Sequence, residues 1–196
     1  MFIITSVEKY FRRAREILDD ILLTTSPERV GCFISSMGVY AGITKDGRDI
    51  RLTFDRSNVC ANFLDYLNDK AAQGITTRLL IGCNPPTASQ ENWPELIRLR
   101  SHQEAWDGLE WKYINNHHLK CILFLVDYKI HNAIIGGRNL SSSRWRDVSW
   151  EVPNLKRDTL IVFNEAWSAA SNLRSYEETV KLQWKKKEEV KNVFMF

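Results

Sequence analysis

The first clear pattern in the chain is a helical one near its start. Between residues 7 and 22, apolar side chains recur at intervals of three or four positions, which is the spacing of one face of an α-helix. The four residues from Thr5 to Glu8 have the sequence of a capping box, in which a hydroxyl and a carboxylate satisfy free backbone N–H groups. The pattern predicts an amphipathic helix with an apolar face of Val7, Tyr10, Phe11, Ala14, Ile17, Leu18, Ile21 and Leu22.

The polar face of this helix is basic, because it carries Lys9, Arg12, Arg13 and Arg15. Charges on the outer face of an amphipathic helix are most simply a solvated surface. A contact with the backbone of a nucleic acid is the alternative interpretation. We expect the solvated surface.

Further along the chain, segments of strand character alternate with segments of helical character. Asp46 and Gly47 are typical of a hairpin turn, and Gly74 is placed to end a helix. In chain order we expect a buried strand at 29–36, a hairpin at 43–54, a helix over about 57–73, a strand at 75–83, a helix over about 93–106, and a late strand within 158–167 that runs into a final long helix over about 164–192. This order favours an α/β fold, with a mixed β-sheet flanked by helices on both faces in a single domain over residues 1–196.

Composition changes this picture little. The net charge of +3 is compatible with a phosphate-bearing partner but too small to establish one. The four cysteines have no paired spacing, which favours reduced thiols over disulfides or a zinc site. The first residues do not resemble a signal peptide, and no apolar run reaches the length of a membrane span. We therefore expect a cytoplasmic protein without a membrane segment.

The most informative stretch covers residues from about 115 to 140, where a long apolar segment lies between two polar ends. It reads as two antiparallel strands joined at Asp127 and Tyr128. Both strands are apolar on both faces, which is typical of a central strand pair covered by helices. The polar ends of the two strands should therefore meet at one edge of the sheet.

Counting back from the turn predicts that His118 lies opposite Gly137 and that Lys120 lies opposite Ile135. Side chains alternate between the faces of a strand, so His118 and Lys120 should project to the same face and His117 to the other. Gly136 and Gly137 would leave an open space with exposed backbone N–H groups beside His118. Asn139 would lie one diagonal step away, and a phosphate fits such a space.

These residues resemble the HKD motif of the phospholipase D superfamily, in which HxK is followed by an aspartate, a Gly-Gly or Gly-Ser pair and an asparagine. Relative to the family pattern, two extra residues lie on each side of the aspartate. A symmetric lengthening of both hairpin arms keeps the facing of the strands, whereas a one-residue change would reverse it. Asp127 is then either the family aspartate, as a structural part of the motif, or a turn residue. The matching residues are His118, Lys120, Asp127, Gly136, Gly137 and Asn139.

The resemblance implies a phospholipase D-like fold and attack of one histidine on a phosphodiester, with a second histidine protonating the leaving oxygen. A neutral imidazole is a competent nucleophile near pH 7, and a two-step displacement replaces one high barrier by two lower ones. Lys120, Asn139 and the N–H groups of Gly136 and Gly137 would bind the phosphoryl oxygens, so neither a metal nor another cofactor is required.

Further residues would complete this site. A carboxylate should hold the far nitrogen of the imidazole, and Asp147 is the first choice and Glu151 the second. Ser141 could contact the phosphate, although a solvated loop serine is the simpler interpretation. Arg138 lies beside the motif and could bind the substrate backbone, as could Arg144 and Arg146. Trp145 and Trp150 could stack on bases. The alternative is that the arginines are ion-paired and the tryptophans belong to the core.

The chain contains a single HxK sequence, whereas the family chemistry uses two such motifs in one site. We therefore expect a symmetric homodimer in which His118 of each subunit reaches one phosphate. In the rival interpretation, His117, His131 or His102 supplies the second role within one subunit. We favour the dimer, because His117 should face the other way and His131 should lie on the apolar middle of a strand.

The phospholipase D superfamily includes nucleases, lipid hydrolases and phosphatidyl transferases. A lipid enzyme normally needs a face or segment that docks on a membrane, and the sequence shows none. We therefore expect a metal-independent nuclease that cleaves DNA or RNA. The alternatives are a lipid phosphodiesterase and a non-catalytic module that binds nucleic acid with the same fold.

Overall fold

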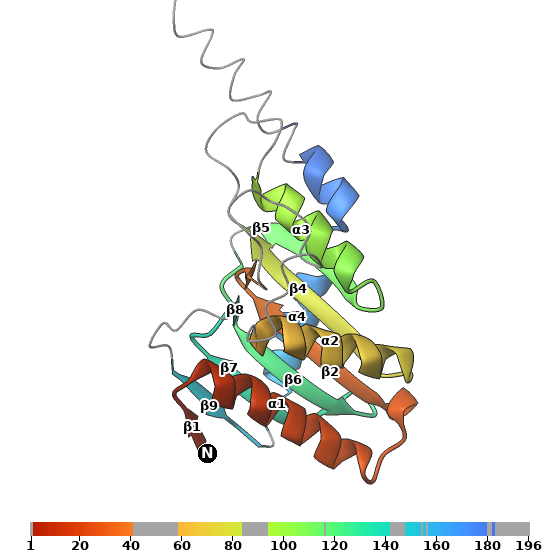
Figure 1. Cartoon of the computed structure of the whole chain (residues 1–196), viewed down its shortest axis with the longest axis vertical. Helices are drawn as coiled ribbons and strands as arrows, with labels where there is room; N and C mark the ends of the chain where they lie inside the picture. The colour runs from red at the N-terminus through yellow and green to blue at the C-terminus, as the bar shows by residue number, and fades with distance from the viewer. Residues whose placement is uncertain are drawn as a thin grey trace, which may run out of the picture.

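The computed structural model describes residues 2–40, 59–83, 94–115, 117–141, 148–153, 155, 157–179 and 182 (Figure 1). The predicted hairpin at Asp46 and Gly47 lies outside these residues. The helices are α1 (Val7–Leu22), α2 (Val59–Ala72), α3 (Pro94–Ala105) and α4 (Asp158–Ala169), with a 3-10 turn at Pro27–Arg29. The strands are β1 (Phe2–Ile4), β2 (Val30–Ser36), β3 (Val39–Tyr40), β4 (Thr76–Cys83), β5 (Glu110–Asn115), β6 (Cys121–Val126), β7 (Lys129–Gly136), β8 (Leu140–Ser141) and β9 (Ser149–Glu151).

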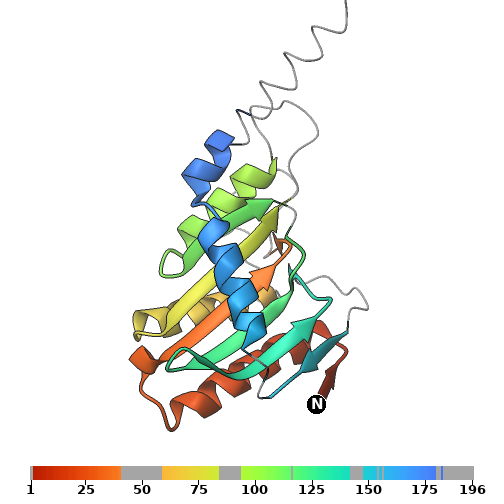
Figure 2. The same ribbon diagram turned by 180° about the vertical axis from the view of Figure 1, so that it is seen from behind.

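Seven of these strands form one mixed sheet in the order β1-β9-β7-β6-β2-β4-β5 (Figures 1 and 2). Strand β2 pairs in parallel with β4, and β4 pairs in parallel with β5. From β2 outward on the other side, β6, β7, β9 and β1 are each antiparallel to their neighbour. The short strands β3 and β8 form a separate parallel pair. The α/β class with a mixed sheet is therefore confirmed.

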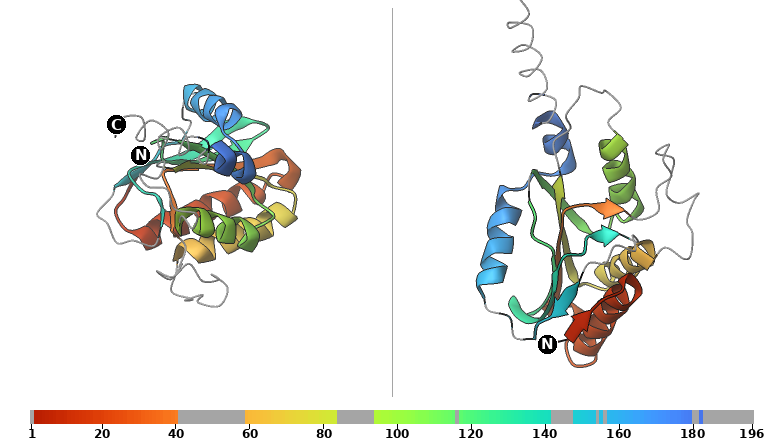
Figure 3. Two further views of the ribbon diagram at one scale, coloured as in Figure 1. Left: turned by 90° about the horizontal axis from the view of Figure 1, so that it is seen from above. Right: turned by 90° about the vertical axis from the view of Figure 1, so that its left-hand side faces the viewer.

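Helices cover both faces of the sheet, as the sequence predicts. The helices α1, α2 and α3 lie on one face and α4 lies on the other (Figure 3). Strand β6 contributes to both cores, because Ile122 and Phe124 belong to the cluster on the α1 side, whereas Cys121, Leu123 and Leu125 belong to the cluster on the α4 side. This explains why its sequence is apolar at consecutive positions.

The cap of α1 lies one residue later than the predicted capping box. Ser6 is the N-cap, and its Oγ accepts a hydrogen bond from the backbone N–H of Lys9 at 3.2 Å. The basic face is also less solvated than expected. Lys9 and Arg12 are exposed, but Arg13 bonds Glu151 on β9 and Arg15 bonds the carbonyl oxygen of Asn62 on α2. Part of this face therefore joins α1 to its neighbours.

The predicted late strand within 158–167 is wrong, because these residues form α4. Leu160, Phe163, Ala166 and Trp167 follow helical spacing and pack on the sheet, where the ring of Phe163 lies 5.3 Å from that of Phe33. Ile161 and Val162 are instead 44% and 49% exposed, and they give the sequence its strand-like apolar run. A short apolar run does not separate a buried strand from one turn of a covering helix.

The predicted final helix is also interrupted within its described part. Ala170 has an extended backbone after α4, and Ser171 pairs with Tyr113 on the edge strand β5 through two backbone hydrogen bonds of 2.8 and 3.0 Å. Residues 173–179 are then helical again. The interruption turns the chain from the α4 face to the edge of the sheet (Figure 2).

A mostly buried ion pair joins β9 to α1. Both carboxylate oxygens of Glu151 accept hydrogen bonds from Arg13, at 2.8 and 2.9 Å, and Oε1 also accepts one from Asn132 Nδ2 at 3.0 Å. The Glu151 side chain is 5% exposed and that of Arg13 is 35% exposed. The guanidinium beside it lowers the pKa of Glu151, with a further contribution from Asn132. The ionised carboxylate therefore stabilises the folded state.

We expect Glu151→Gln to lower the free energy of unfolding at pH 7 by about 2 kcal/mol, which is less than for a fully buried pair because Arg13 is partly solvated. The pKa of Glu151 is lower in the folded state than its ordinary value of 4.5. The ionised carboxylate therefore stabilises the folded protein at pH values above 4.5, and this stabilisation is lost as the pH falls through the lowered pKa. Urea unfolding of the wild type and of Glu151→Gln, at pH 7 and at pH values below 4.5, measures the difference in their free energies of unfolding.

A matched control is Glu16→Gln, because the carboxylate of Glu16 also contacts Arg13, at 3.2 Å, but is 48% exposed. This variant should change the free energy of unfolding by less than about 0.5 kcal/mol. An effect of Glu151→Gln that stays the same at low pH would rule out the ion pair as its cause.

Candidate active site

The candidate site is built on the hairpin of β6 and β7. Its two-residue turn has positive φ angles at Asp127 (49°) and Tyr128 (60°), as in a type I′ turn, and Val126 pairs with Lys129 as predicted. The register then shifts between Phe124 and Leu125. The partners of these two residues are 132 and 130, so one residue of β7 is left over at a β-bulge.

The bulge corrects two predictions. Beyond it Ile135 faces Cys121 rather than Lys120, and the register of the two strands ends there, before His118 and Gly137. The residue left over at the bulge is His131, which is exposed and does not lie on an apolar mid-strand. An inserted residue moves the facing positions by one, which sequence counting from the turn does not detect.

Asp127 lies at the turn end of the hairpin, away from His118. The intervening strand β6 has six residues, so roughly 20 Å separates the two ends. The carboxylate of Asp127 accepts a hydrogen bond from Arg29 Nε at 2.8 Å, and its backbone N–H donates to the carbonyl oxygen of Arg29 at 2.9 Å. Arg29 lowers the pKa of Asp127. Asp127 therefore lies in the turn of the hairpin, where it is paired with Arg29.

The two polar ends of the hairpin meet at the opposite edge of the sheet. The backbone N–H of Gly136 donates to the carbonyl oxygen of Lys120 at 3.2 Å, so the HxK and GGxN segments lie side by side. His118 is exposed and Lys120 is half-buried. Both residues precede β6 and belong to no strand. The backbone of Lys120 is thus next to the glycine pair, and His118, two residues earlier, is exposed.

Asn139 is held with its carboxamide in one orientation. Its Oδ1 accepts a hydrogen bond from the backbone N–H of Met37 at 3.1 Å and lies 3.5 Å from Ser36 Oγ. A backbone N–H is a donor only, so the amide oxygen must face Met37. Ser36 is buried and its Oγ also accepts from the N–H of Leu140, which fixes the segment that carries Asn139. The donor group Nδ2 of Asn139 is the part left for other partners.

The glycine pair brings strands together, and its N–H groups are already in use. A Cβ atom on Gly136 would lie 2.5 Å from both Ser149 Cα and the carbonyl oxygen of Val148, so a side chain there would prevent the pairing of β7 with β9. The N–H of Gly137 donates to the carbonyl oxygen of Val148 at 3.0 Å, and that of Gly136 to Lys120. The expectation of exposed glycine N–H groups is therefore wrong.

Other predicted site residues lie elsewhere. Arg138 is 5% exposed and its Nη2 donates to the carbonyl oxygen of Thr5 at 2.7 Å, so its guanidinium faces the start of α1. Glu151, the second choice for an imidazole partner, is bound by Arg13 instead. Ser141 lies in β8, and its side chain is outside the described part. Asp147, Arg144, Trp145 and Arg146 are also outside the described residues.

Sequence reasoning missed two residues that contact the HxK segment. Ser35 Oγ lies 2.8 Å from Nε2 of His117 and donates a hydrogen bond to the carbonyl oxygen of Leu119 at 2.9 Å. A Cβ atom on Gly82 would overlap the carbonyl oxygen of His117, so the backbone of His117 crosses directly over β4. An isolated glycine in a strand can signal such a close approach, whereas a serine at the end of a strand carries no comparable signal.

His117 and Asn139 are bound on opposite faces of the sheet. Ser35 and Ser36 are consecutive in β2, so their side chains point to opposite faces, and Ser35 shares its face with Phe33 on the α4 side. His117 is half-buried, and its pKa is lowered by burial and by the neighbouring His118. The residue before His118 is therefore anchored on one face of the sheet, and Asn139 is anchored on the other.

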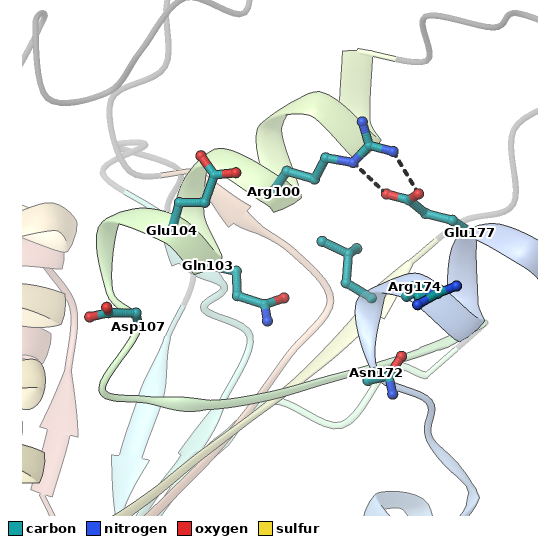
Figure 4. Close-up of a pocket in the computed structure, with 8 residues that line it drawn as sticks. Arg100, Gln103, Glu104, Asp107, Asn172, Arg174 and Glu177 are labelled. Carbon is teal, nitrogen blue, oxygen red and sulfur yellow. Dashed lines mark hydrogen bonds and ion pairs between the residues drawn. The ribbon is translucent and has the colours of Figure 1, made fainter.

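A separate cavity of about 830 Å³ lies between α3 and residues 173–179 (Figure 4). It is lined by charged and amide side chains and by Leu173, and the carboxylate of Glu177 accepts two hydrogen bonds of 2.6 Å from Arg100 across it. Among the described residues that line it, none belongs to the hairpin ends. This cavity is therefore distinct from the candidate active site.

The described part of the chain contains neither a metal-binding cluster nor a membrane-spanning helix. No group of three or more His, Cys, Asp and Glu side chains there is arranged to hold a metal ion. Among the described helices, none combines the length and the apolar character needed to span a bilayer.

The fold defines an α/β protein with a mixed sheet whose polar hairpin ends meet at one edge. No family model and no curated protein sequence matches the chain. Among solved structures it is similar to Nuc, a phospholipase D family member from Salmonella typhimurium, with 12% identity and a TM-score of 0.47 over 81% of this chain and 89% of that chain.

Two other solved structures are similar over smaller parts of their own length. Polyphosphate kinase from Porphyromonas gingivalis matches 78% of this chain with 23% of its own, at 12% identity and a TM-score of 0.48. TrmBL2, an archaeal chromatin protein described with a novel mode of DNA binding, matches 87% of this chain, at 12% identity and a TM-score of 0.44. This chain spans about half the length of TrmBL2, 52%.

Proposed function

We propose that the chain is a phosphodiesterase that cleaves DNA or RNA through a phosphohistidine intermediate. The observation that supports this most directly is the 3.2 Å hydrogen bond from Gly136 N–H to the carbonyl oxygen of Lys120, which joins the HxK segment to the GGxN segment. The exposure of His118 is a second support, because a nucleophile must be accessible to its substrate.

In the first step, one imidazole nitrogen of His118 attacks the phosphorus atom, and the bond from phosphorus to the leaving oxygen breaks. A second histidine, in its protonated imidazolium form, gives its proton to that oxygen. In the second step, the same group, now neutral, takes a proton from water as the water attacks phosphorus. The P–N bond then breaks and free His118 is restored.

Lys120 and Asn139 supply positive charge and hydrogen-bond donation to the phosphoryl oxygens in this proposal. The ammonium of Lys120 is a donor only, and the fixed orientation of Asn139 leaves Nδ2 as its donor. Groups that are held in place before reaction need no reorganisation as charge develops in the transition state. The N–H groups of Gly136 and Gly137 bind backbone carbonyls, so they have no role in binding the phosphate in this proposal.

The second histidine comes, in this proposal, from a symmetric dimer. His117 is bonded to Ser35 on the α4 face, His131 lies at the bulge in β7, and His102 is buried in α3. None of these three is placed at the hairpin end with an exposed imidazole. The partner's His118 would meet this requirement through twofold symmetry.

The test is cleavage of plasmid DNA, of single-stranded RNA and of a generic aryl phosphodiester in excess EDTA. We expect cleavage of nucleic acid that persists with the chelator, because the proposed charge stabilisation comes from Lys120 and Asn139 rather than from a metal. Phosphatidylcholine vesicles tested in parallel address a lipid substrate. Loss of cleavage with EDTA would contradict the proposed mechanism, and hydrolysis of lipid alone would contradict the proposed substrate class.

A non-catalytic module that binds nucleic acid is the second candidate. The engagement of Glu151 by Arg13 favours it, because this carboxylate is then not available to orient His118. Such a module would bind DNA or RNA with an affinity that falls with salt and would not cleave it. Binding without turnover in the same assay would select this candidate.

A further inference from the structure

His118 belongs to no strand, so backbone pairing within β6 does not hold it in place. The contacts on either side of it do. Ser35 Oγ lies 2.8 Å from Nε2 of His117 and 2.9 Å from the carbonyl oxygen of Leu119. One buried hydroxyl thus contacts the residue before His118 and the residue after it.

The direction of these two hydrogen bonds follows from the number of protons. A carbonyl oxygen accepts only, so the single hydroxyl proton of Ser35 must point to Leu119. The contact between Ser35 Oγ and His117 therefore needs its proton from Nε2 of His117. His117 is then protonated on Nε2, and in the neutral ring Nδ1 carries the lone pair.

The neutral ring is the form expected near pH 7. Burial and the neighbouring His118 both lower the pKa of His117. The backbone gives a third constraint, because the carbonyl oxygen of His117 lies where a Cβ atom of Gly82 would be. The segment is held by a side chain of β2 on one side and by the backbone of β4 below it.

We propose that Ser35 and His117 act as positioning residues, which form a clasp that selects one tautomer of His117 and fixes the backbone on both sides of His118. This inference rests on the proposed function only for its effect on catalysis. The clasp itself consists of the two hydrogen bonds that Ser35 Oγ makes with His117 and Leu119, and these do not depend on any activity. Correct placement matters for a nucleophile, because a displacement of about 1 Å can lower a rate by about 100-fold.

The first test is direct and needs no activity. In ¹⁵N NMR spectra of the full chain at pH 7.5, we expect His117 to show a proton-bearing Nε2 and an unprotonated Nδ1. Ser35→Ala should return His117 toward the tautomer mixture of a free imidazole. A wild-type His117 that is protonated on Nδ1 alone, or a tautomer unchanged by Ser35→Ala, would overturn the proposal.

The second test compares His117→Gln with His117→Ala. The side-chain amide of glutamine places an N–H near the position of Nε2 of histidine, so it can still donate to Ser35. We expect His117→Ala and Ser35→Ala each to lower kcat by about 10- to 100-fold with little change in KM, and His117→Gln to keep most of kcat. The exposed histidine at the bulge provides a control, His131→Gln, which should leave both constants unchanged.

The two tests separate the possible failures. If the wild type shows the expected tautomer but cleaves no phosphodiester, the proposed function fails and the clasp remains. If the wild type cleaves but His117→Ala, at unchanged thermal midpoint, keeps its kcat, the positioning role fails and the proposed function remains. Equal losses of kcat in His117→Gln and His117→Ala would also reject the clasp, because the N–H donor would then have no role.

Discussion

Replacement of His118 by alanine is expected to lower chelator-resistant cleavage of a phosphodiester by at least about 1000-fold. The imidazole of His118 is the proposed nucleophile, and its loss removes the covalent path altogether. Lys120 and Asn139 would remain to bind the phosphate, so substrate affinity should change much less than kcat. Initial rates on the aryl phosphodiester in excess EDTA measure the effect, with saturation curves to separate kcat from KM.

The fold of this variant should be intact, because His118 is exposed and belongs to no strand. Its thermal midpoint should equal that of the wild type. His131→Ala removes a second exposed histidine from the same hairpin and should cleave normally. Comparable rates for His118→Ala and the wild type would exclude His118 as the nucleophile and would leave the other histidines or the binding module to be considered.

The covalent intermediate offers an independent readout of the same prediction. Reaction with a radiolabelled phosphodiester followed by rapid quenching in alkali should leave phosphate attached to the wild-type protein. A phosphoramidate bond is labile to acid and stable to base, which distinguishes it from a phosphoserine. The label should be absent from His118→Ala.

Part of the order of strands and helices in the first two thirds of the chain is predictable from its sequence, whereas β1, β3 and β5 are not predicted. Amphipathic spacing identifies α1, and Gly74, with φ +104°, ends the segment after α2 as a helix-stop signal does. The apolar runs before Ser36 and Cys83 are β2 and β4. These signals are local, because each depends only on which face of one element is buried or on the backbone conformation that one residue must adopt.

The register of paired strands, and whether an apolar segment forms a strand of the sheet or a helix that covers it, are not decided by the local sequence. The bulge at His131 depends on how β7 fits both β6 and β9, so counting outward from a correct turn still placed Lys120 one position out. The apolar run of α4 is compatible with a strand or a helix until the sheet that it covers is known. In both cases the deciding contacts come from segments that are distant in sequence.

The candidate site also contains residues that the sequence identifies and contacts that it does not. Residue types and spacing pick out His118, Lys120 and Asn139, and the structure places the backbone of Lys120 next to Gly136. The same reasoning places Arg138 in contact with substrate, whereas it is turned toward Thr5. The clasp of Ser35 and His117 joins residues 82 positions apart, and nothing in the pattern of either segment indicates it.

Substitution of Gly82 by alanine is expected to be among the most damaging single-carbon changes in the sheet. A Cβ atom there would overlap the carbonyl oxygen of His117, and the obstacle is backbone rather than the end of a movable side chain. Either β4 or the segment that carries His118 and Lys120 must shift. We expect the free energy of unfolding to fall by about 3 kcal/mol and cleavage to be lost even under conditions where the protein is folded. Urea unfolding and the EDTA assay measure the two effects.

Gly31→Ala is the matched control, because Gly31 lies in the adjacent strand β2 of the same sheet. A Cβ atom there would lie 3.3 Å from Cε1 of Phe33 and 3.5 Å from Cβ of Leu125, contacts that a small movement of the ring relieves. This variant should change stability by less than about 1 kcal/mol and retain cleavage. If Gly82→Ala were as stable and as active as Gly31→Ala, the backbone of His117 would not cross over β4 as closely as described, and the support proposed for His118 would be lost with it.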